Sequence, residues 1–180
     1  MNTEKAYLNV VHQNFKSMKT LAEGAIEQLT FEELHFLPNR ESNSVAILVK
    51  HISGNMISRF TSFLTSDGEK PNRNRDTEFE DGYISKEELL AAWNFGWETL
   101  FKALSDLKEE DILKTVYIRS EPHSVMEALQ RQISHYSLHI GQILYIGKLI
   151  KNDGWKTLSV PRGKSDRFTQ SIKDRFIKNE

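Results

Sequence analysis

The sequence predicts an all-α fold, a single four-helix bundle of residues 1–180. Four long segments repeat apolar residues at three- and four-residue steps, which is the period of a helix that buries one face. Capping-box pairs, a Ser or Thr three residues before a Glu, mark helix starts at Thr30, Ser85 and Ser124. No set of segments alternates apolar and polar residues as strands do. Amphipathic helices without strands pack on one another, so we expect a bundle.

The first long helix is expected to end near Leu29. Thr30 and Glu33 then predict a short helical turn, which Pro38 closes because proline cannot continue a helix. The apolar stripe of the first helix comprises Tyr7, Val10, Val11, Phe15, Met18, Leu21, Ala22 and Ala25.

The second long helix is expected to begin at Asn43 or Ser44, both good N-caps, and to run to about Ser66. Gly54 lies inside it, and two interpretations are open: the glycine permits close approach of a neighbouring helix, or it is incidental. Its stripe includes polar members and comprises Ile47, Leu48, His51, Ile52, Asn55, Ile57, Arg59 and Phe63.

A polar stretch, residues 66–82, follows this helix and is expected to be a long surface loop. Loops of this length are usually functional or mobile. The third long helix is expected to begin after Ser85, and residues 115–119 predict a short extended piece or loop. The fourth helix should run from Val125 to about Ile150, and the polar tail from Asn152 is expected to be irregular.

The composition is that of an ordinary globular protein, with 38% hydrophobic and 27% charged residues. The net charge of −1 gives no overall electrostatic attraction to nucleic acid, so a nucleic-acid partner is not expected. No segment is apolar enough to span a bilayer, so a membrane is not expected as a partner either. The N-terminal residues lack the pattern of a signal peptide, so we expect a cytoplasmic protein. The chain has no cysteine, which excludes disulfides, thiolate metal sites and thiol nucleophiles.

Basic residues recur in the tail, where they are more typical of a solvated terminus than of a nucleic-acid site. This basic set comprises Arg162, Lys164, Arg167, Lys173, Arg175 and Lys178.

His135 and His139 form an H-x3-H pair on the predicted fourth helix. Residues four apart lie on one helical face, so both imidazoles can bind one ion, and imidazole suits zinc, nickel, iron or copper. Position 136 is Tyr, where zinc proteases of the H-E-x-x-H type have their catalytic Glu. The spacing alone leaves a second interpretation open, a pair of surface or hydrogen-bonded histidines.

His51 is the third candidate ligand, because it lies in an apolar stripe where an unpartnered imidazole is costly to bury. Three histidines from two helices would leave a coordination position open for water or substrate, as in catalytic sites. By spacing, Asn55 and Gln142 are candidates to support these ligands through hydrogen bonds, whereas Arg131 is expected to be solvated. No Asp or Glu lies at an obvious base position near the histidines.

Three stretches carry a resemblance to a known superfamily: SVAILVKHISGNMISRFTSFLTSDGEKPNRNRDTEFE from Ser44, SHYSLHIGQILYIGKLI from Ser134 and SVPRGKSDRF from Ser159. The chain resembles the DinB-like four-helix bundles, which include bacillithiol S-transferases and metal-dependent hydrolases, and within them a Bacillus-type subfamily of unknown function. The resemblance implies that the three histidines hold zinc, nickel or a similar divalent ion, and that the protein is a homodimer.

Two functions remain open. The first is a metal-dependent enzyme that activates a thiol or water against a small-molecule substrate, as a thiol S-transferase or a hydrolase does. The resemblance implies a low-molecular-weight thiol such as bacillithiol as co-substrate, and a chain without cysteine fits a nucleophile supplied from outside. The second is a non-catalytic protein that binds a metal or small ligand, with the metal bracing the bundle. The sequence assigns no catalytic residue.

Overall fold

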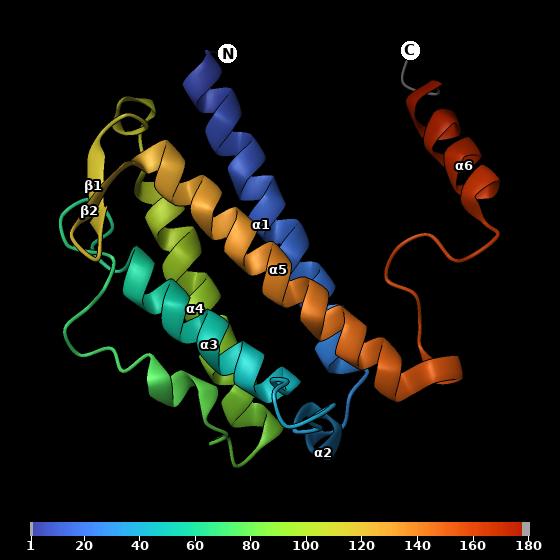
Figure 1. Ribbon diagram of the computed structural model, residues 1–180. Helices are drawn as coiled ribbons and strands as arrows, with labels where there is room; N and C mark the ends of the chain where they lie inside the picture. Colours follow the sequence, from blue (N-terminus) through green and yellow to red (C-terminus); the bar gives the residue numbers. More distant parts are fainter. Residues whose placement is uncertain (1, 178–180) are drawn as a thin grey trace.

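The computed structural model describes residues 2–177 and is mostly helical, with a small two-stranded sheet (Figure 1). None of the described helices is long and apolar enough to cross a membrane. Lys178 of the basic set lies outside the described residues. Four long helices lie side by side, α1 (Thr3–Glu27), α3 (Val45–Phe60), α4 (Lys86–Asp106) and α5 (Val125–Lys151).

Short elements connect these helices. The capping box at Thr30 is present and opens α2 (Phe31–Leu34), as predicted. The box at Ser124 is also present at the start of α5. At α4 the Ser85 side chain accepts from the Glu88 backbone N–H, but the Glu88 carboxylate accepts from the backbone N–H of Ile84, so only half of that box forms. Single turns of 3-10 helix form η1 (Asp76–Phe79), η2 (Glu109–Asp111) and η3 (Asn152–Gly154).

The ring of Phe15 on α1 contacts a buried aromatic residue from each of the other three long helices. Its centroid lies 6.4 Å from Phe60 on α3, 6.4 Å from Trp97 on α4 and 6.0 Å from Tyr136 on α5. All four rings are buried. Tilted and edge-to-face contacts of this kind add to the free energy of burying large apolar surfaces, so this cluster fixes where the helices meet.

The second long helix is shorter than predicted. α3 ends at Phe60 rather than near Ser66, and Ser62 takes a left-handed backbone with φ of 50°. The chain then turns back, and residues 66–82 run along the outer side of α3 (Figure 1). We call residues 66–82 the covering segment. It is a loop, as expected, but because it lies against α3 it makes that helix buried on nearly all sides.

Close approach of two helices occurs at Gly96 of α4 and not at Gly54, for which the sequence left it open. A Cβ at position 96 would lie 3.0 Å from the Cα of Ser53 on α3, closer than ordinary van der Waals contact, so a larger residue there would push the two helices apart. A Cβ at Gly54 would instead meet the carboxylate of Glu78, 2.5 Å from Oε1. Gly54 therefore makes room for a side chain of the covering segment.

A β-hairpin, absent from the prediction, joins α4 to α5. β1 (Thr115–Ile118) confirms the expected extended piece, and it pairs antiparallel with β2 (Glu121–Ser124). Arg119 and Ser120 form the turn with positive φ values of 56° and 65°, the conformation of a two-residue hairpin loop. The Asp67 carboxylate accepts both of their backbone N–H groups, at 2.9 and 2.7 Å, and so fastens the hairpin to the covering segment.

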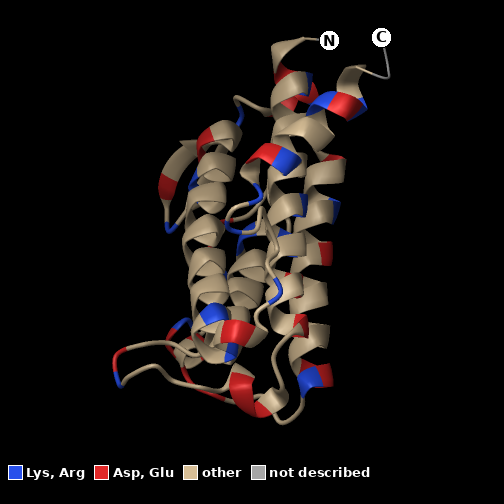
Figure 2. Cartoon of the chain, turned by 90° about the vertical axis from the view of Figure 1, so that its right-hand side faces the viewer, with Lys and Arg blue, Asp and Glu red and all other residues tan. Residues whose placement is uncertain are grey.

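The C-terminal tail is helical in part, which corrects the expected irregular structure. Trp155 and Leu158 pack on the long helices, and the Gln28 side chain hydrogen-bonds both backbone groups of Lys156. Beyond them α6 (Ser165–Ile177) stands apart from the other helices and buries none of its residues (Figure 1). Basic and acidic positions are interspersed along the helices seen in Figure 2.

Replacing Asp67 with Ala should lower the free energy of unfolding by about 2 kcal/mol at pH 7, because three backbone N–H groups lose a charged acceptor that is partly screened by solvent. These hydrogen bonds, first that from Glu69, hold the pKa of the Asp67 carboxyl below its usual value. A lowered pKa in the folded state gives stability that is present above the unfolded pKa of about 3.9 and is lost as the pH falls through the folded pKa.

Urea unfolding at pH 7 and pH 3 measures the difference between the Asp67→Ala variant and the native chain. The difference should be smaller at pH 3, because that pH lies below the unfolded pKa of about 3.9 and the unfolded chain then binds the proton that the folded carboxylate resists. Asp153→Ala, which removes an exposed carboxylate in η3, is the matched control and should change stability little. An Asp67 effect of equal size at both pH values would contradict the assignment.

Candidate metal centre

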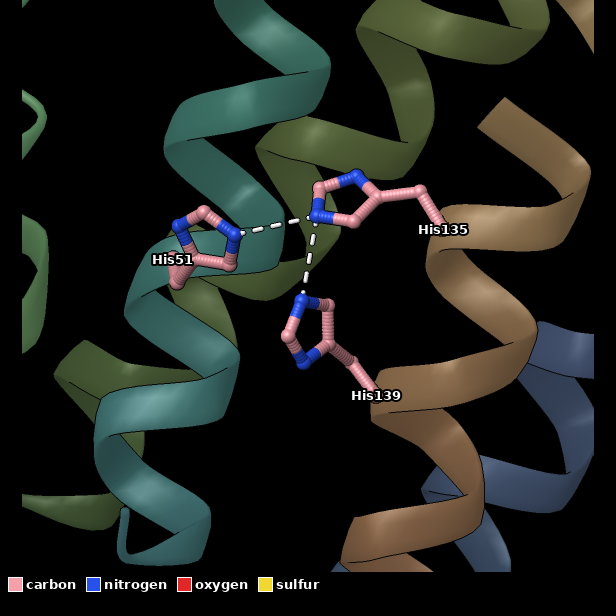
Figure 3. Close-up of side chains that lie close together, drawn as sticks. All are labelled: His51, His135 and His139. Atoms are coloured by element: carbon pink, nitrogen blue, oxygen red, sulfur yellow. Dashed lines mark hydrogen bonds between the residues drawn. The ribbon is translucent and has the colours of Figure 1, made fainter. Parts of the chain in front are cut away.

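Three histidine side chains converge between α3 and α5. Figure 3 shows His51 of α3 facing His135 and His139 of α5. The Nε2 atom of His135 lies 3.2 Å from that of His51 and 3.0 Å from that of His139. His51 is buried, and the other two are half-buried. The structure thus brings together all three histidines that the sequence singles out.

The spacing of these nitrogens fits a single metal ion. One ligand atom from each histidine lies within 4.8 Å of the others. Around zinc, with Zn–N bonds of about 2.0–2.1 Å and tetrahedral angles, ligand nitrogens lie roughly 3.4 Å apart. The two contacts to His135 are close to this value, so a small shift of the rings would accommodate an ion. Three nitrogen ligands would leave further coordination positions free.

Hydrogen bonds on the far side of two rings orient their nitrogens. Nδ1 of His51 lies 2.9 Å from Oε2 of Glu78, and Nδ1 of His139 lies 2.9 Å from Oε1 of Gln142. A carboxylate or amide oxygen can only accept, so both Nδ1 atoms carry the proton and both Nε2 atoms present a lone pair. This is the arrangement in which proteins hold metal-binding imidazoles.

The protonation of His135 supports the same interpretation. Burial, and after it the electrostatic influence of the neighbouring His139, His51, Arg59 and Arg73, lowers the pKa of His135 to about 3, so its ring is neutral at pH 7. A neutral His135 has at most one Nε2 proton for two Nε2 contacts. At least one contact therefore joins two lone pairs, an arrangement that a cation between the rings would stabilise.

Glu78 is the residue of this site that sequence reasoning missed: the sequence showed no Asp or Glu at an obvious base position, and Glu78 instead lies behind the His51 ring. It is buried, and Arg73 donates to both of its oxygens, at 2.7 and 2.8 Å. Burial acts to raise the pKa of the Glu78 carboxyl, but the hydrogen bonds from His51 and Arg73 hold it below its usual value. The group is therefore an ionised acceptor that fixes the His51 ring.

The surroundings of Glu78 explain why periodicity could not reveal it. It lies on η1, a single turn inside a polar stretch, where no repeating apolar pattern marks a buried position. The neighbouring Phe79 packs against the His51 ring at 4.6 Å between centroids, and Arg75 lies over Phe79. A signal was present in Gly54, three residues after His51, since a glycine on the same helical face leaves room for an incoming side chain.

Of the two residues expected to support the ligands through hydrogen bonds, only Gln142 contacts a histidine. Gln142 contacts His139 directly. Asn55 contacts no histidine: its Oδ1 accepts from the hydroxyl of buried Tyr136 at 2.9 Å, which links the aromatic core to the edge of the site. Arg131 is exposed, as expected, yet it lines the same cavity as His51 and His135.

Comparison with known proteins gives a family and a fold. A family model described as "Protein of unknown function (DUF1572)" matches residues 2–164. A solved structure, the crystal structure of a conserved protein from Enterococcus faecalis, superposes with a TM-score of 0.62 at 15% sequence identity. The match covers 84% of this chain and 99% of that chain. Because the sequence identity is so low, the likeness is one of fold alone. No curated protein matches the chain.

Replacing Gly54 with Ala should weaken metal affinity by roughly tenfold or more, the effect typical of losing a group that holds a metal-binding histidine. The added methyl group would displace the Glu78 carboxylate from His51. Isothermal titration with zinc measures the change.

Gly141→Ala is the matched control for this substitution. Position 141 is also a helical glycine, between His139 and Gln142, but nothing lies within 4 Å of an added Cβ. This variant should keep full zinc affinity. Equal affinities for the two variants would show that Glu78 does not hold His51 in a metal-binding position.

Proposed function

Because the chain belongs to the DUF1572 family of proteins of unknown function, we propose its function from the site itself: a metal-dependent enzyme that activates a thiol or water, similar to thiol S-transferases or hydrolases. One observation carries the proposal. Three Nε2 atoms converge on one point, and two of their rings are held from behind by Glu78 and Gln142. Imidazoles oriented in this way, with coordination positions left free, are typical of catalytic rather than closed structural sites.

The fold supports a finer assignment, a four-helix bundle of the DinB-like kind. The four long helices meet at the Phe15 ring, and His51 and the H-x3-H pair come from two of them. This is the ligand arrangement that the resemblance implied. We extend the proposal to zinc or nickel as the ion, since three imidazoles suit either.

The chain's own residues would position the reactants. A bound divalent ion would supply Lewis acidity, which makes a thiol or water nucleophilic at neutral pH. His51, His135 and His139 would hold it, and Gln142 would keep the His139 ring in place. Glu78 is tied up by Arg73 and His51, so we assign it a positioning role. With no cysteine in the chain, the thiol would be a small co-substrate such as bacillithiol.

A structural role is the alternative, and one observation favours it. The histidine cluster joins α3, α5 and, through Glu78, the covering segment in one network. An ion there would brace three parts of the chain without any reaction taking place.

We also propose a homodimer formed through α5. Leu138, Tyr145 and Leu149 are more than half exposed and line one groove of about 750 Å³. Residues at these spacings share one side of a helix, and a helix face of this kind can pair with its own copy about a two-fold axis.

Turnover with and without the ion tests the enzyme. Metal-loaded protein should transfer a small thiol to a generic aromatic electrophile, or hydrolyse an activated ester, and a chelator should abolish the reaction. His51→Ala should abolish stoichiometric metal binding and turnover as completely as His135→Ala or His139→Ala, because three ligands converge on one ion. Elemental analysis and steady-state rates measure the two effects.

His123→Ala is the matched control, since His123 lies on β2 away from the cluster, and it should keep both metal and turnover. Full metal affinity in the His51 variant would contradict the three-histidine site. Absence of turnover together with a lower melting temperature after chelation would instead support the structural role.

Light scattering tests the homodimer. The native protein in solution should have a mass twice that of a single chain. Leu138→Glu should lower the measured mass toward that of the monomer, because a charge in an apolar interface is costly to desolvate. Leu113→Glu is the control, because Leu113 is 78% exposed but lies outside the groove. This variant should have the same mass in solution as the native protein. A monomeric native chain would contradict the proposal.

A further inference from the structure

A cavity of about 360 Å³ opens beside the histidine cluster, and arginines dominate its wall. His51 and His135 line one side of it. Five arginines complete much of the rest, Arg59, Arg73, Arg75, Arg119 and Arg131. They come from α3, the covering segment, the hairpin turn and α5. Arginines from four separate parts of the chain thus meet at one cavity, next to the candidate ligands.

Acidic residues near this cavity neutralise only part of that charge. Glu69 pairs with Arg59 at 3.1 Å, Arg73 at 3.3 Å and Arg119 at 2.9 Å. Glu78 pairs with Arg73. Five guanidinium groups therefore share two carboxylates, an excess of three positive charges, and counting Asp67, which caps the backbone of the hairpin turn, still leaves two. Neither carboxylate lines the cavity.

Two of the arginines are free of carboxylates within the described part of the chain. Arg75 contacts the ring of Phe79, and no ion pair involves Arg75 or Arg131. Both side chains are exposed to solvent, and both line the cavity. Their guanidinium groups are therefore available to a ligand, and the planar fork of such a group matches the two oxygens of a carboxylate or phosphate.

Two buried polar atoms of the same wall also lack partners among the described residues. Arg59 is 6% exposed, and its Nε has no acceptor. Gln132 is 4% exposed, and its Oε1 has no donor. Buried polar groups in folded proteins are almost always hydrogen-bonded. An anion's oxygen could accept from Nε of Arg59, whereas Oε1 of Gln132 needs a donor, which an ionised carboxylate or phosphate does not offer.

We propose that this cavity binds the anionic end, a carboxylate or a phosphate, of the small-molecule substrate. Arg75, Arg131 and Arg119 would hold the anion, and the cavity is small enough that the rest of a bound molecule would reach His51 and His135. A volume of about 360 Å³ lies at the lower end of the range for ligand pockets, which fits a compact metabolite rather than a polymer. Anion binding itself does not depend on the proposed function. The inference rests on the proposed function only where it takes the bound anion to be part of a substrate that reacts at the histidines.

Isothermal titration with inorganic phosphate and with malonate tests the anion site at low ionic strength, where screening is weak. Both metal-loaded and chelator-treated protein are titrated. Binding should be present in both forms, because the arginines do not depend on the ion. Arg131→Gln and Arg75→Gln should each weaken binding by about tenfold and the double variant by about a hundredfold, as one charged hydrogen-bonding group is lost in each.

Arg162→Gln is the matched control, since it removes an exposed arginine from the tail, and it should bind both anions as the native chain does. Binding of phosphate alone would assign the site to phosphoryl compounds, and binding of malonate alone would assign it to carboxylates. Unchanged affinity in the double variant, or phosphate and malonate binding no tighter than chloride, would overturn the proposal. Because the chelator-treated protein is measured separately, failure of the metal site would not produce this result.

Discussion

The structure depends on partners for the polar and charged side chains that α3 buries. His51 and Arg59 lie on a helix that is covered both by its neighbours and by the covering segment. A charge or an unpaired polar ring in such a position is costly unless partners surround it. The covering segment supplies them: Glu78, itself held by Arg73, pairs with His51, and Glu69 and the carbonyl of Gly68 pair with Arg59. The segment and the polar face of α3 are therefore interdependent.

This interdependence joins fold to site. The carboxylate that orients a candidate metal ligand is itself held by an arginine of the cavity wall, and the hairpin that carries Arg119 is fastened to the same segment by Asp67. Each polar residue thus has two roles, one in covering α3 and one in shaping the centre. The hydroxyl of Tyr136, whose ring belongs to the aromatic core, donates to Asn55 in the wall of the cavity beside the centre.

Features with a regular period were predictable from the sequence, and features without one were not. The long helices and the caps at Thr30 and Ser124 follow from local patterns, and so did the convergence of His135 with His139. The end of α3, the hairpin pairing and the burial of Glu78 depend on contacts between distant residues. Val10 belongs to the predicted stripe of the first helix yet is exposed, because periodicity identifies an apolar face but not its width.

The position of the three histidines along the chain has a consequence for how the centre assembles. His51 and His135 are 84 residues apart, and Glu78 lies between them in sequence. A contact of this range closes a long loop, and the entropy lost in closing it must be offset by other contacts of the folded chain. A nascent chain would present His51 long before its partners, and α5 alone would offer only two imidazoles. Tight metal uptake would therefore report that synthesis and folding of the helical core are complete.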